Sequence, residues 1–382
     1  MQKQKLILEL NQNGMLFDKA ESQKLLEMKR NQLQQLEAEL AKELKIAPSI
    51  LNDNPALIKS LYNANIFISG LSMEVLKAER FKSPILEKLY QLRKIYQFLF
   101  NYGKKLSQSL TDENRLYGHW KLNGTVSGRL TCSDFNIQSV HNSMKPYFIA
   151  EKGSTLIISD FSQIELRVLA ELSQDARLIG IFKNGGDYHA QTASILFGKP
   201  QNTITEQERS IAKRLNFAIC YGVSTTGLEK LLIDMNISTP ASLADMLRDR
   251  FYSSFLGVKN YQNSVLTSSL VKDLSGRQWN TRNLSLSQRL NYPIQASAAA
   301  IMLESLLLLM QKKKENWKIV NVIHDELICE VPVEEQVAAK TTVIACMRDG
   351  FEKYIQGVPF KAETVIRNRW KPLEEERKMN NE

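Results

Sequence analysis

Apolar residues recur at helical spacing through the early part of the chain. Residues 19–45 contain no Gly or Pro, and their leucines fall close to one face of a helix while Glu and Lys fill the others. Residues 84–102 again space apolar and aromatic side chains by threes and fours, in a stretch rich in Lys and Arg. The pattern predicts two amphipathic helices. The basic residues of the second helix are equally consistent with a solvent-exposed face and with a surface that binds a phosphate backbone.

The pattern changes near Gly118, where short apolar runs alternate with Gly, Ser, Thr and Asn. Residues 154–159 and 319–323 are typical of buried strands, and each run leads within two residues to an aspartate. The second run passes through His324-Asp325-Glu326 and then becomes apolar again. This predicts a β-hairpin with the acids at its tip.

Helical spacing dominates between about residues 187 and 270 and returns at 334–355, before a strand-like segment at 364–366. The chain has 382 residues, 43% of them hydrophobic, which is enough to bury several cores. We therefore expect several subdomains and exclude a minimal binding module.

Charge and cysteine content narrow the class further. The 50 Lys and Arg exceed the 41 Asp and Glu, so the net charge is +9, which favours a polyanion such as nucleic acid; a basic fold without such a partner is the alternative. The four cysteines form no CxxC pair, which argues against a zinc knuckle or a disulfide framework. The N-terminus lacks an apolar core, and Ser and Glu interrupt the apolar residues 296–310, so we expect no signal peptide and no membrane span.

Asp160 and Asp325 are candidate metal ligands because each follows a buried strand. Two carboxylates about 4 Å apart repel by roughly 4 kcal/mol at an effective dielectric constant near 20, so the two could be neighbours only with a cation between them. Mg²⁺ is held by one or two carboxylates together with phosphate oxygens, and two such ions can assist an in-line displacement. Taken alone, either acid also fits a loop aspartate that caps a turn.

Residues 208–222 predict a helix with an unusual face. Arg209, Lys213, Phe217 and Tyr221 stand four residues apart and would form one ridge about 18 Å long, cationic at its N-terminal end and aromatic at the other. Cations near the positive end of a helix dipole favour an anion there, so a triphosphate and a base would suit this ridge. An ordinary amphipathic helix with both aromatic residues in a core is the alternative reading.

Together these segments resemble the A, B and C motifs of family A DNA polymerases, the bacterial polymerase I group with its phage relatives. The resemblance is carried by Asp160-x-Ser-Gln-Ile-Glu-Leu-Arg, by Arg209-x3-Lys-x3-Phe-x3-Tyr-Gly and by His324-Asp-Glu. Ser127-Gly-Arg-Leu with the following Asn136-x-Gln138 resembles the family's primer-template minor-groove segment, and Asn291-x-Pro-x-Gln295 its template-side segment. The match is strong from about Gly118 to Trp370 and weak before it.

The resemblance implies an α+β fold shaped as a right hand, with a helical thumb, an antiparallel-sheet palm and helical fingers. Residues 1–117 would form the thumb and 118–172 the first part of the palm with motif A. Residues 173–284 would form the fingers, with the motif B helix at 208–222, and 285–382 the second part of the palm with motif C.

The resemblance also implies roles for individual residues. Asp160 and Asp325 would bind two Mg²⁺ ions, with Mn²⁺ as a substitute, and Glu326 would complete the catalytic group. Glu165 would act as the steric gate against a ribose 2′-hydroxyl. The remaining nucleotide-binding residues would be Gln163, His189, Arg209, Lys213, Phe217 and Tyr221. The DNA-binding residues would be Arg129, Asn136, Gln138, Asn291, Gln295 and His324.

The implied activity is that of a DNA-directed DNA polymerase that adds dNTPs to a primer 3′-hydroxyl in replication or repair. It would bind primer-template DNA and dNTPs and no membrane, and it would be a monomer. An exonuclease, a helicase or a processivity factor would be a separate protein. Only three aspartates precede Gly118, so we expect no proofreading exonuclease in this chain. The expected location is the cytoplasm of a bacterial or phage-infected cell, near the nucleoid.

Some positions depart from the family pattern, and two rival functions remain. Ala296-Ser297 stands where Gly-Thr is usual, Ala300 where an Asp is expected, and Ser287 where an Arg is common. A single-subunit RNA polymerase has a similar basic helix, but it carries Gly at the position of Glu165 and Ser at that of Glu326. The other rival is a DNA-binding scaffold that has lost catalysis, and use of RNA templates also stays open.

Overall fold

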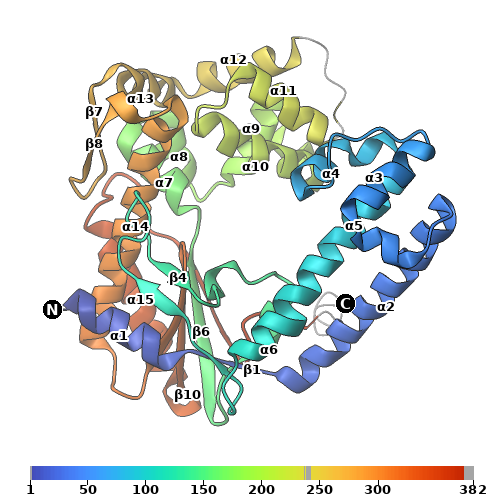
Figure 1. Ribbon diagram of the computed structural model, residues 1–382. Coiled ribbons are helices and arrows are strands. Elements are labelled where there is room, and N and C mark those ends of the chain that lie inside the picture. The colour runs from blue at the N-terminus through green and yellow to red at the C-terminus, as the bar shows by residue number, and fades with distance from the viewer. Residues whose placement is uncertain (1, 236, 238–241, 374–382) are drawn as a thin grey trace. The chain divides into compact units, whose positions relative to one another are not determined.

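The computed structural model describes residues 2–235, 237 and 242–373, and the chain divides into two compact units (Figure 1). The first unit contains Met1–Asn13, His119–Ser133 and Glu151–Asn368. The second contains Gly14–Gly118, Asp134–Ala150 and Arg369–Glu382. The expected division into thumb, palm and fingers stays a prediction, and residues 374–382 of its last segment lie outside the described residues.

The first unit is built around a four-stranded antiparallel sheet in the order β11-β6-β10-β9. The apolar run Leu156-Ile157-Ile158 makes β6 a central strand buried on both faces. The predictions of a strand at 154–159 and of a hairpin after 319–323 are confirmed. The strands are β6 (Ser154–Phe161), β9 (Lys318–Ile323), β10 (Glu326–Pro332) and β11 (Ala362–Arg367).

Helices pack on this sheet and extend beyond it. Helix α15 (Gln336–Glu352) contacts β6, β10 and β11 and runs beside α14 (Leu286–Lys312), as Figure 1 shows. Helix α1 (Gln2–Asn13) packs on β9 and α14. Within the described residues, α14 is the one helix long and apolar enough to cross a membrane, and 56% of its most apolar window is buried inside the protein.

The remaining helices of the first unit follow β6 in the chain. Arg167 on the first of them is buried, and its guanidinium donates to the carbonyl oxygens of Ser162 at 2.7 Å and Pro359 at 2.6 Å. This fixes the turn that leaves β6. The helices are α7 (Ile164–Ser173), α8 (Ala176–Lys183), α9 (Tyr188–Phe197), α10 (Glu206–Cys220), α11 (Thr225–Asp234), α12 (Leu243–Ser254) and α13 (Leu256–Thr267).

Two small hairpins complete the first unit. The first pairs β3 (His119–Lys121) with β4 (Thr131–Ser133), and the second pairs β7 (Leu270–Lys272) with β8 (Gln278–Asn280). The segment that connects β3 to β4 contributes Arg129 to the candidate site described below.

The second unit is mainly helical. Its leucines form a core in which α2 (Lys19–Leu44) runs beside α5 (Pro84–Phe98). A small three-stranded sheet has the strand order β2-β1-β5. The helix predicted at 19–45 is confirmed. The one predicted at 84–102 changes at Leu99 into a π-helix, Leu99–Lys105, which spacing by threes and fours does not detect. The other elements are α3 (Asn54–Asn63), α4 (Met73–Glu79), α6 (Leu106–Ser109), β1 (Met15–Phe17), β2 (Arg115–Leu116) and β5 (Phe148–Ile149).

Candidate active site

Three acids meet at one end of the sheet. Asp160 on β6 is the direct partner of Glu326 on β10 in the antiparallel register. The backbone N–H of Phe161 donates to the carbonyl oxygen of Asp325 at 3.1 Å, so Asp325 lies in the hairpin turn beside the end of β6. The structure thus brings together two aspartates that are far apart in the sequence.

Two non-glycine residues in left-handed conformation shape this end of the sheet. His324 has a φ of 54° in the β9–β10 turn, and Gln163 has a φ of 56° where the chain turns from β6 into α7. Such backbone is uncommon outside glycine and is held by its surroundings. It presents Asp325 and the first turn of α7 to the same space.

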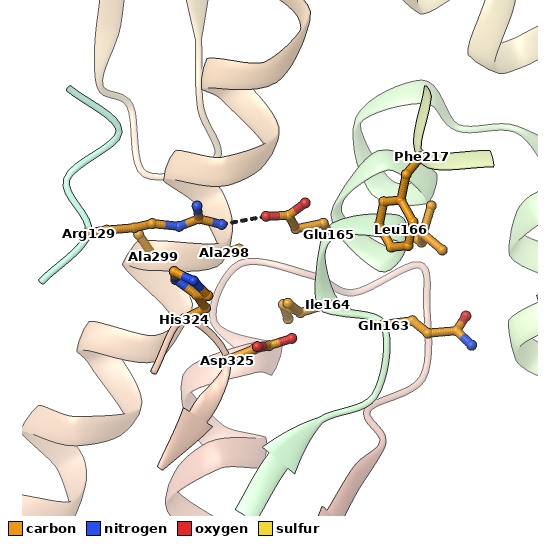
Figure 2. A pocket seen from close by; sticks show the side chains of 10 residues that line it. All are labelled: Arg129, Gln163, Ile164, Glu165, Leu166, Phe217, Ala298, Ala299, His324 and Asp325. Atoms are coloured by element: carbon orange, nitrogen blue, oxygen red, sulfur yellow. Dashed lines mark hydrogen bonds and ion pairs between the residues drawn. The ribbon is translucent and has the colours of Figure 1, made fainter. Parts of the chain in front are cut away.

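That space is a pocket of about 220 Å³. Figure 2 shows Glu165 extending toward Arg129, with His324 and Asp325 below this ion pair in the view. The pocket joins the sheet end, α7, α10, α14 and the β3–β4 segment. Its lining residues are Arg129, Gln163, Ile164, Glu165, Leu166, Phe217, Ala298, Ala299, His324 and Asp325.

Burial raises the pKa of both carboxyls in the pocket. The pKa of Asp325 is raised by burial, and a backbone hydrogen bond and the electrostatic effects of His324 and Arg129 oppose this only in part. The pKa of Glu165 is also raised by burial, lowered by Arg129 and raised again by the charge of Asp325. Arg129 Nη2 donates to Glu165 Oε1 at 2.5 Å. Glu165 therefore has a cationic partner, whereas Asp325 forms no ion pair with any residue that the structure describes.

The predicted helix at 208–222 is confirmed, with different bounds. It begins at Glu206, where Thr205 and Glu208 form a capping box, and it ends at Cys220 before Tyr221 and Gly222. Glu206 and Glu208 in the first turn match the helix dipole. At the other end, Phe217 and Tyr221 lie with their ring centroids 6.1 Å apart.

The two cations of the ridge differ in their surroundings. Arg209 Nε donates to Asp187 Oδ2 at 2.6 Å. Burial opposes ionisation of Asp187, but the Arg209 hydrogen bond and two backbone N–H donors leave its pKa lowered. Lys213 is exposed and forms no ion pair within the described ranges. An incoming anion would compete with Asp187 for Arg209 but would find Lys213 available.

His189 is buried at the start of α9, with 2% of its surface exposed. Its Nδ1 lies 3.1 Å from Asn216 Nδ2, and its ring packs on Phe217 at 5.9 Å. Burial, with smaller contributions from Lys213 and Arg209, lowers its pKa to about 4. The imidazole is therefore neutral at neutral pH.

Two polar atoms near the site are buried without a hydrogen-bond partner among the described residues. They are Gln163 Oε1 and the hydroxyl of Tyr221. Buried polar groups are rarely left unpaired, so each suits a partner that the chain itself does not supply.

The residues expected to contact DNA are divided between the two units. Asn291 and Gln295 lie on α14 at four-residue steps from the pocket residue Ala299, so the three share one helix face. Asn136 and Gln138 belong to the second unit, where the Asn136 side chain caps a short 3₁₀ turn by accepting from the Gln138 N–H.

Several residues near the site were missed by sequence reasoning. Ile164, Leu166, Ala298 and Ala299 line the pocket but carry no chemical signal in the sequence. Asn216 was detectable in principle, because it lies three residues after Lys213 on the predicted helix.

A solved structure with the same fold identifies the class. The POL domain of Pol1 from M. smegmatis, in complex with DNA primer-template and dNTP, matches with a TM-score of 0.85 and 23% identity over 97% of this chain and 69% of that one. The fold is therefore that of a polymerase domain, mixed helix and antiparallel sheet. The family model of DNA polymerase family A matches residues 19–372, and the chain belongs to that family.

Curated relatives agree with this assignment. DNA polymerase I of Aquifex aeolicus is 35% identical over 277 residues, which are 70% of this chain and 48% of the relative. The thermostable DNA polymerase I of Thermus caldophilus is 31% identical over 364 residues, 89% of this chain and 41% of the relative. The chain thus spans about half the length of these relatives or less.

Proposed function

We propose that this chain catalyses template-directed DNA synthesis, adding dNTPs to a primer 3′-hydroxyl with release of pyrophosphate. One observation carries the proposal beyond family membership: Asp160, Asp325 and Glu326 meet at a sheet end beside a pocket that the helix α10 also lines through Phe217. The relatives' names and the DNA and dNTP bound in the related structure support it.

The acids suit hard divalent cations. The described residues contain no group of three or more His, Cys, Asp or Glu able to hold a metal by themselves. Mg²⁺ is commonly bound by one or two carboxylates, with waters and substrate phosphate oxygens completing its shell. We propose that Asp160 and Asp325 hold two Mg²⁺ ions and that Glu326 supports them. When bound there, Mg²⁺ would supply positive charge to stabilise the displacement.

The side chains along α10 would hold the incoming nucleotide. Lys213 and Arg209 would neutralise the triphosphate, Arg209 after leaving Asp187, and His189 would donate one hydrogen bond as a neutral imidazole. Phe217 would pack on the nucleotide. The Tyr221 hydroxyl and Gln163 Oε1 have no hydrogen-bond partner in the part of the chain that the structure describes. The hydroxyl would lie beside the templating base, and the Gln163 oxygen would accept from the nucleotide.

The sugar would be recognised in this pocket of the first unit, and the DNA by residues that line the pocket or lie on other elements. Glu165, which lines it, would exclude a ribose 2′-hydroxyl. Arg129 and His324 would contact the duplex near the primer end, and Asn291 and Gln295 the template side of it. Asn136 and Gln138 would add minor-groove contacts. Such contacts are largely blind to sequence, so binding should weaken strongly with salt.

Primer extension with Mg²⁺ and one nucleotide at a time tests this function. The expected result is addition of the dNTP complementary to the template, with little addition of rNTPs. A preference for rNTPs would favour an RNA polymerase instead. Tight binding of the primed duplex without any extension would favour a DNA-binding scaffold.

A further inference from the structure

The segment that carries Arg129 is held in place by an arginine about 150 positions further along the chain. This segment joins β3 to β4. Arg277, at the turn between β7 and β8, donates from Nη2 to Asn123 Oδ1 at 3.1 Å and from Nη1 to the carbonyl oxygen of Val126 at 3.4 Å. One guanidinium therefore joins two points of the β3–β4 segment.

Gly128 allows the segment to lie directly against this guanidinium. Its φ is +79°, which favours glycine, and a Cβ placed there would come within 2.3 Å of Arg277 Nη1. Gly128 immediately precedes Arg129. The Arg277 side chain therefore packs against the backbone immediately before Arg129 and helps to set its position.

Arg277 is itself firmly anchored. Asp273, 4% exposed, accepts hydrogen bonds from the Arg277 N–H and the Ser275 hydroxyl, both at 2.8 Å. The Leu274 N–H donates to Ser297 Oγ on α14 at 2.9 Å. The turn therefore fixes Arg277 to the helix that also lines the pocket.

The anchored segment carries Arg129, which forms an ion pair with Glu165 in the pocket (Figure 2). A carboxylate whose oxygen is engaged by a guanidinium keeps one orientation. A released carboxylate can rotate, and it can accept a hydrogen bond from a 2′-hydroxyl instead of excluding it.

We propose that Arg277 is a positioning residue for sugar selection: it fixes the β3–β4 segment so that Arg129 holds Glu165 in the orientation that excludes ribonucleotides. The inference rests on the proposed function, in which Glu165 faces the sugar. Arg277 would thus join the residues that determine sugar selection, acting through Arg129 and without contacting the substrate.

The test compares Arg277→Gln with Lys272→Gln. Lys272 is exposed on the same hairpin, and its side chain forms no hydrogen bond or ion pair with the segment among the described residues, so its substitution removes the same charge near any bound duplex. The readout is kcat/KM for a dNTP divided by kcat/KM for the matching rNTP. Arg277→Gln should lower this ratio about tenfold, the scale of one contact energy, mainly by lowering KM for the rNTP. Lys272→Gln should leave the ratio unchanged.

A second background shows whether the effect passes through Glu165. When Arg277→Gln is added to Glu165→Gln, the ratio should change no further. Asn123→Ala, which removes one acceptor of Arg277 on an exposed segment, should lower the ratio in the same direction and keeps the test available if Arg277→Gln fails to fold.

An unchanged ratio in both Arg277→Gln and Asn123→Ala overturns the inference, as does an equal effect in the Glu165→Gln background. A loss of duplex affinity shared with Lys272→Gln, at constant ratio, would make Arg277 a phosphate contact. If the unsubstituted chain extends no primer at all, the proposed function fails instead.

Discussion

Asp160 and Glu326 face each other across β6 and β10 as direct register partners, and the next acid back along the chain, Asp325, lies in the hairpin turn. The backbone hydrogen bond from Phe161 to Asp325 joins the turn to the end of β6. The spacing of the acids is therefore set by the sheet ladder, and substitutions of the side chains should leave it intact.

Isosteric substitution of either aspartate should abolish catalysis and spare the fold. Asp160→Asn and Asp325→Asn each remove one anionic ligand, and we expect nucleotide addition to fall by about 10³-fold or more, roughly 4 kcal/mol of transition-state stabilisation. Single-turnover primer extension measures the loss. Duplex affinity, measured in parallel, should change by less than about threefold because the charge removed is not a phosphate contact.

Glu334→Gln is the matched control for these substitutions. Glu334 is exposed in the turn Val333–Glu335, which follows the end of β10 opposite to Glu326. It should retain more than about half of the activity, the usual result for a surface substitution. Substantial extension by Asp160→Asn or Asp325→Asn would contradict the metal assignment.

Lys213→Gln should weaken nucleotide binding more than it slows chemistry. Lys213 is exposed on the ridge and has no anionic partner in the parts of the chain described, so its charge is available to a triphosphate. We expect KM for the dNTP to rise about tenfold or more, the cost of one charge-assisted contact. Steady-state kinetics at saturating duplex measures this.

Arg214→Gln removes the same charge from the next position of α10, which lies on a different helix face. KM should then change by less than about twofold. Equal effects of the two substitutions would mean that α10 contributes only a diffuse positive field.

His189 should make the protein less stable as the pH falls. Its pKa is lowered from 6.5 to about 4 in the folded state, so between these values the unfolded chain holds a proton that the folded chain does not. Stability should decrease as the pH drops from about 6.5 to about 4, by roughly 2–3 kcal/mol in total. Urea unfolding across this range measures it.

His189→Gln should flatten that part of the pH profile. Burial also lowers the pKa of His141, but this contribution is common to both proteins and cancels in the comparison. Parallel profiles for the two proteins would show that His189 does not carry the effect.

Asp175→Asn should destabilise the helical part of the first unit. Asp175 is buried and accepts from the Leu178 N–H at 2.8 Å, the Gly257 N–H at 2.8 Å and the Val258 N–H at 3.3 Å, so it joins the starts of α8 and α13. Loss of a charged acceptor here should cost about 2–3 kcal/mol. Chemical denaturation followed by circular dichroism measures it, with exposed Asp234→Asn as the control expected to stay within about 0.5 kcal/mol.

Elements set by local periodicity were predictable from the sequence. The strand that became β6, the β9–β10 hairpin and the helix α10 each have a short-range pattern that tertiary contacts did not override. The convergence of Asp160 and Asp325 was inferred from two observations: each aspartate follows a buried strand, and a shared cation would allow the two carboxylates to be neighbours. The family resemblance supported this inference.

Contacts between distant segments were not predictable in the same way. Arg277 reaches Asn123, and Asp187 pairs with Arg209, yet nothing in the local spacing marks either pair. The π-helix after Phe98 was also not predicted, because one extra residue in a helical turn leaves the spacing of apolar residues almost unchanged.

The left-handed backbone at Gln163 and His324 has a consequence for how this protein can change. Glycine at either position would relieve backbone strain of about 1 kcal/mol or more, so glycine variants at these positions are a route to higher stability. Those variants would lose a side chain that lines the pocket. Selection for heat resistance alone would therefore tend to erode the site at these two positions, whereas selection for activity would preserve the strained backbone.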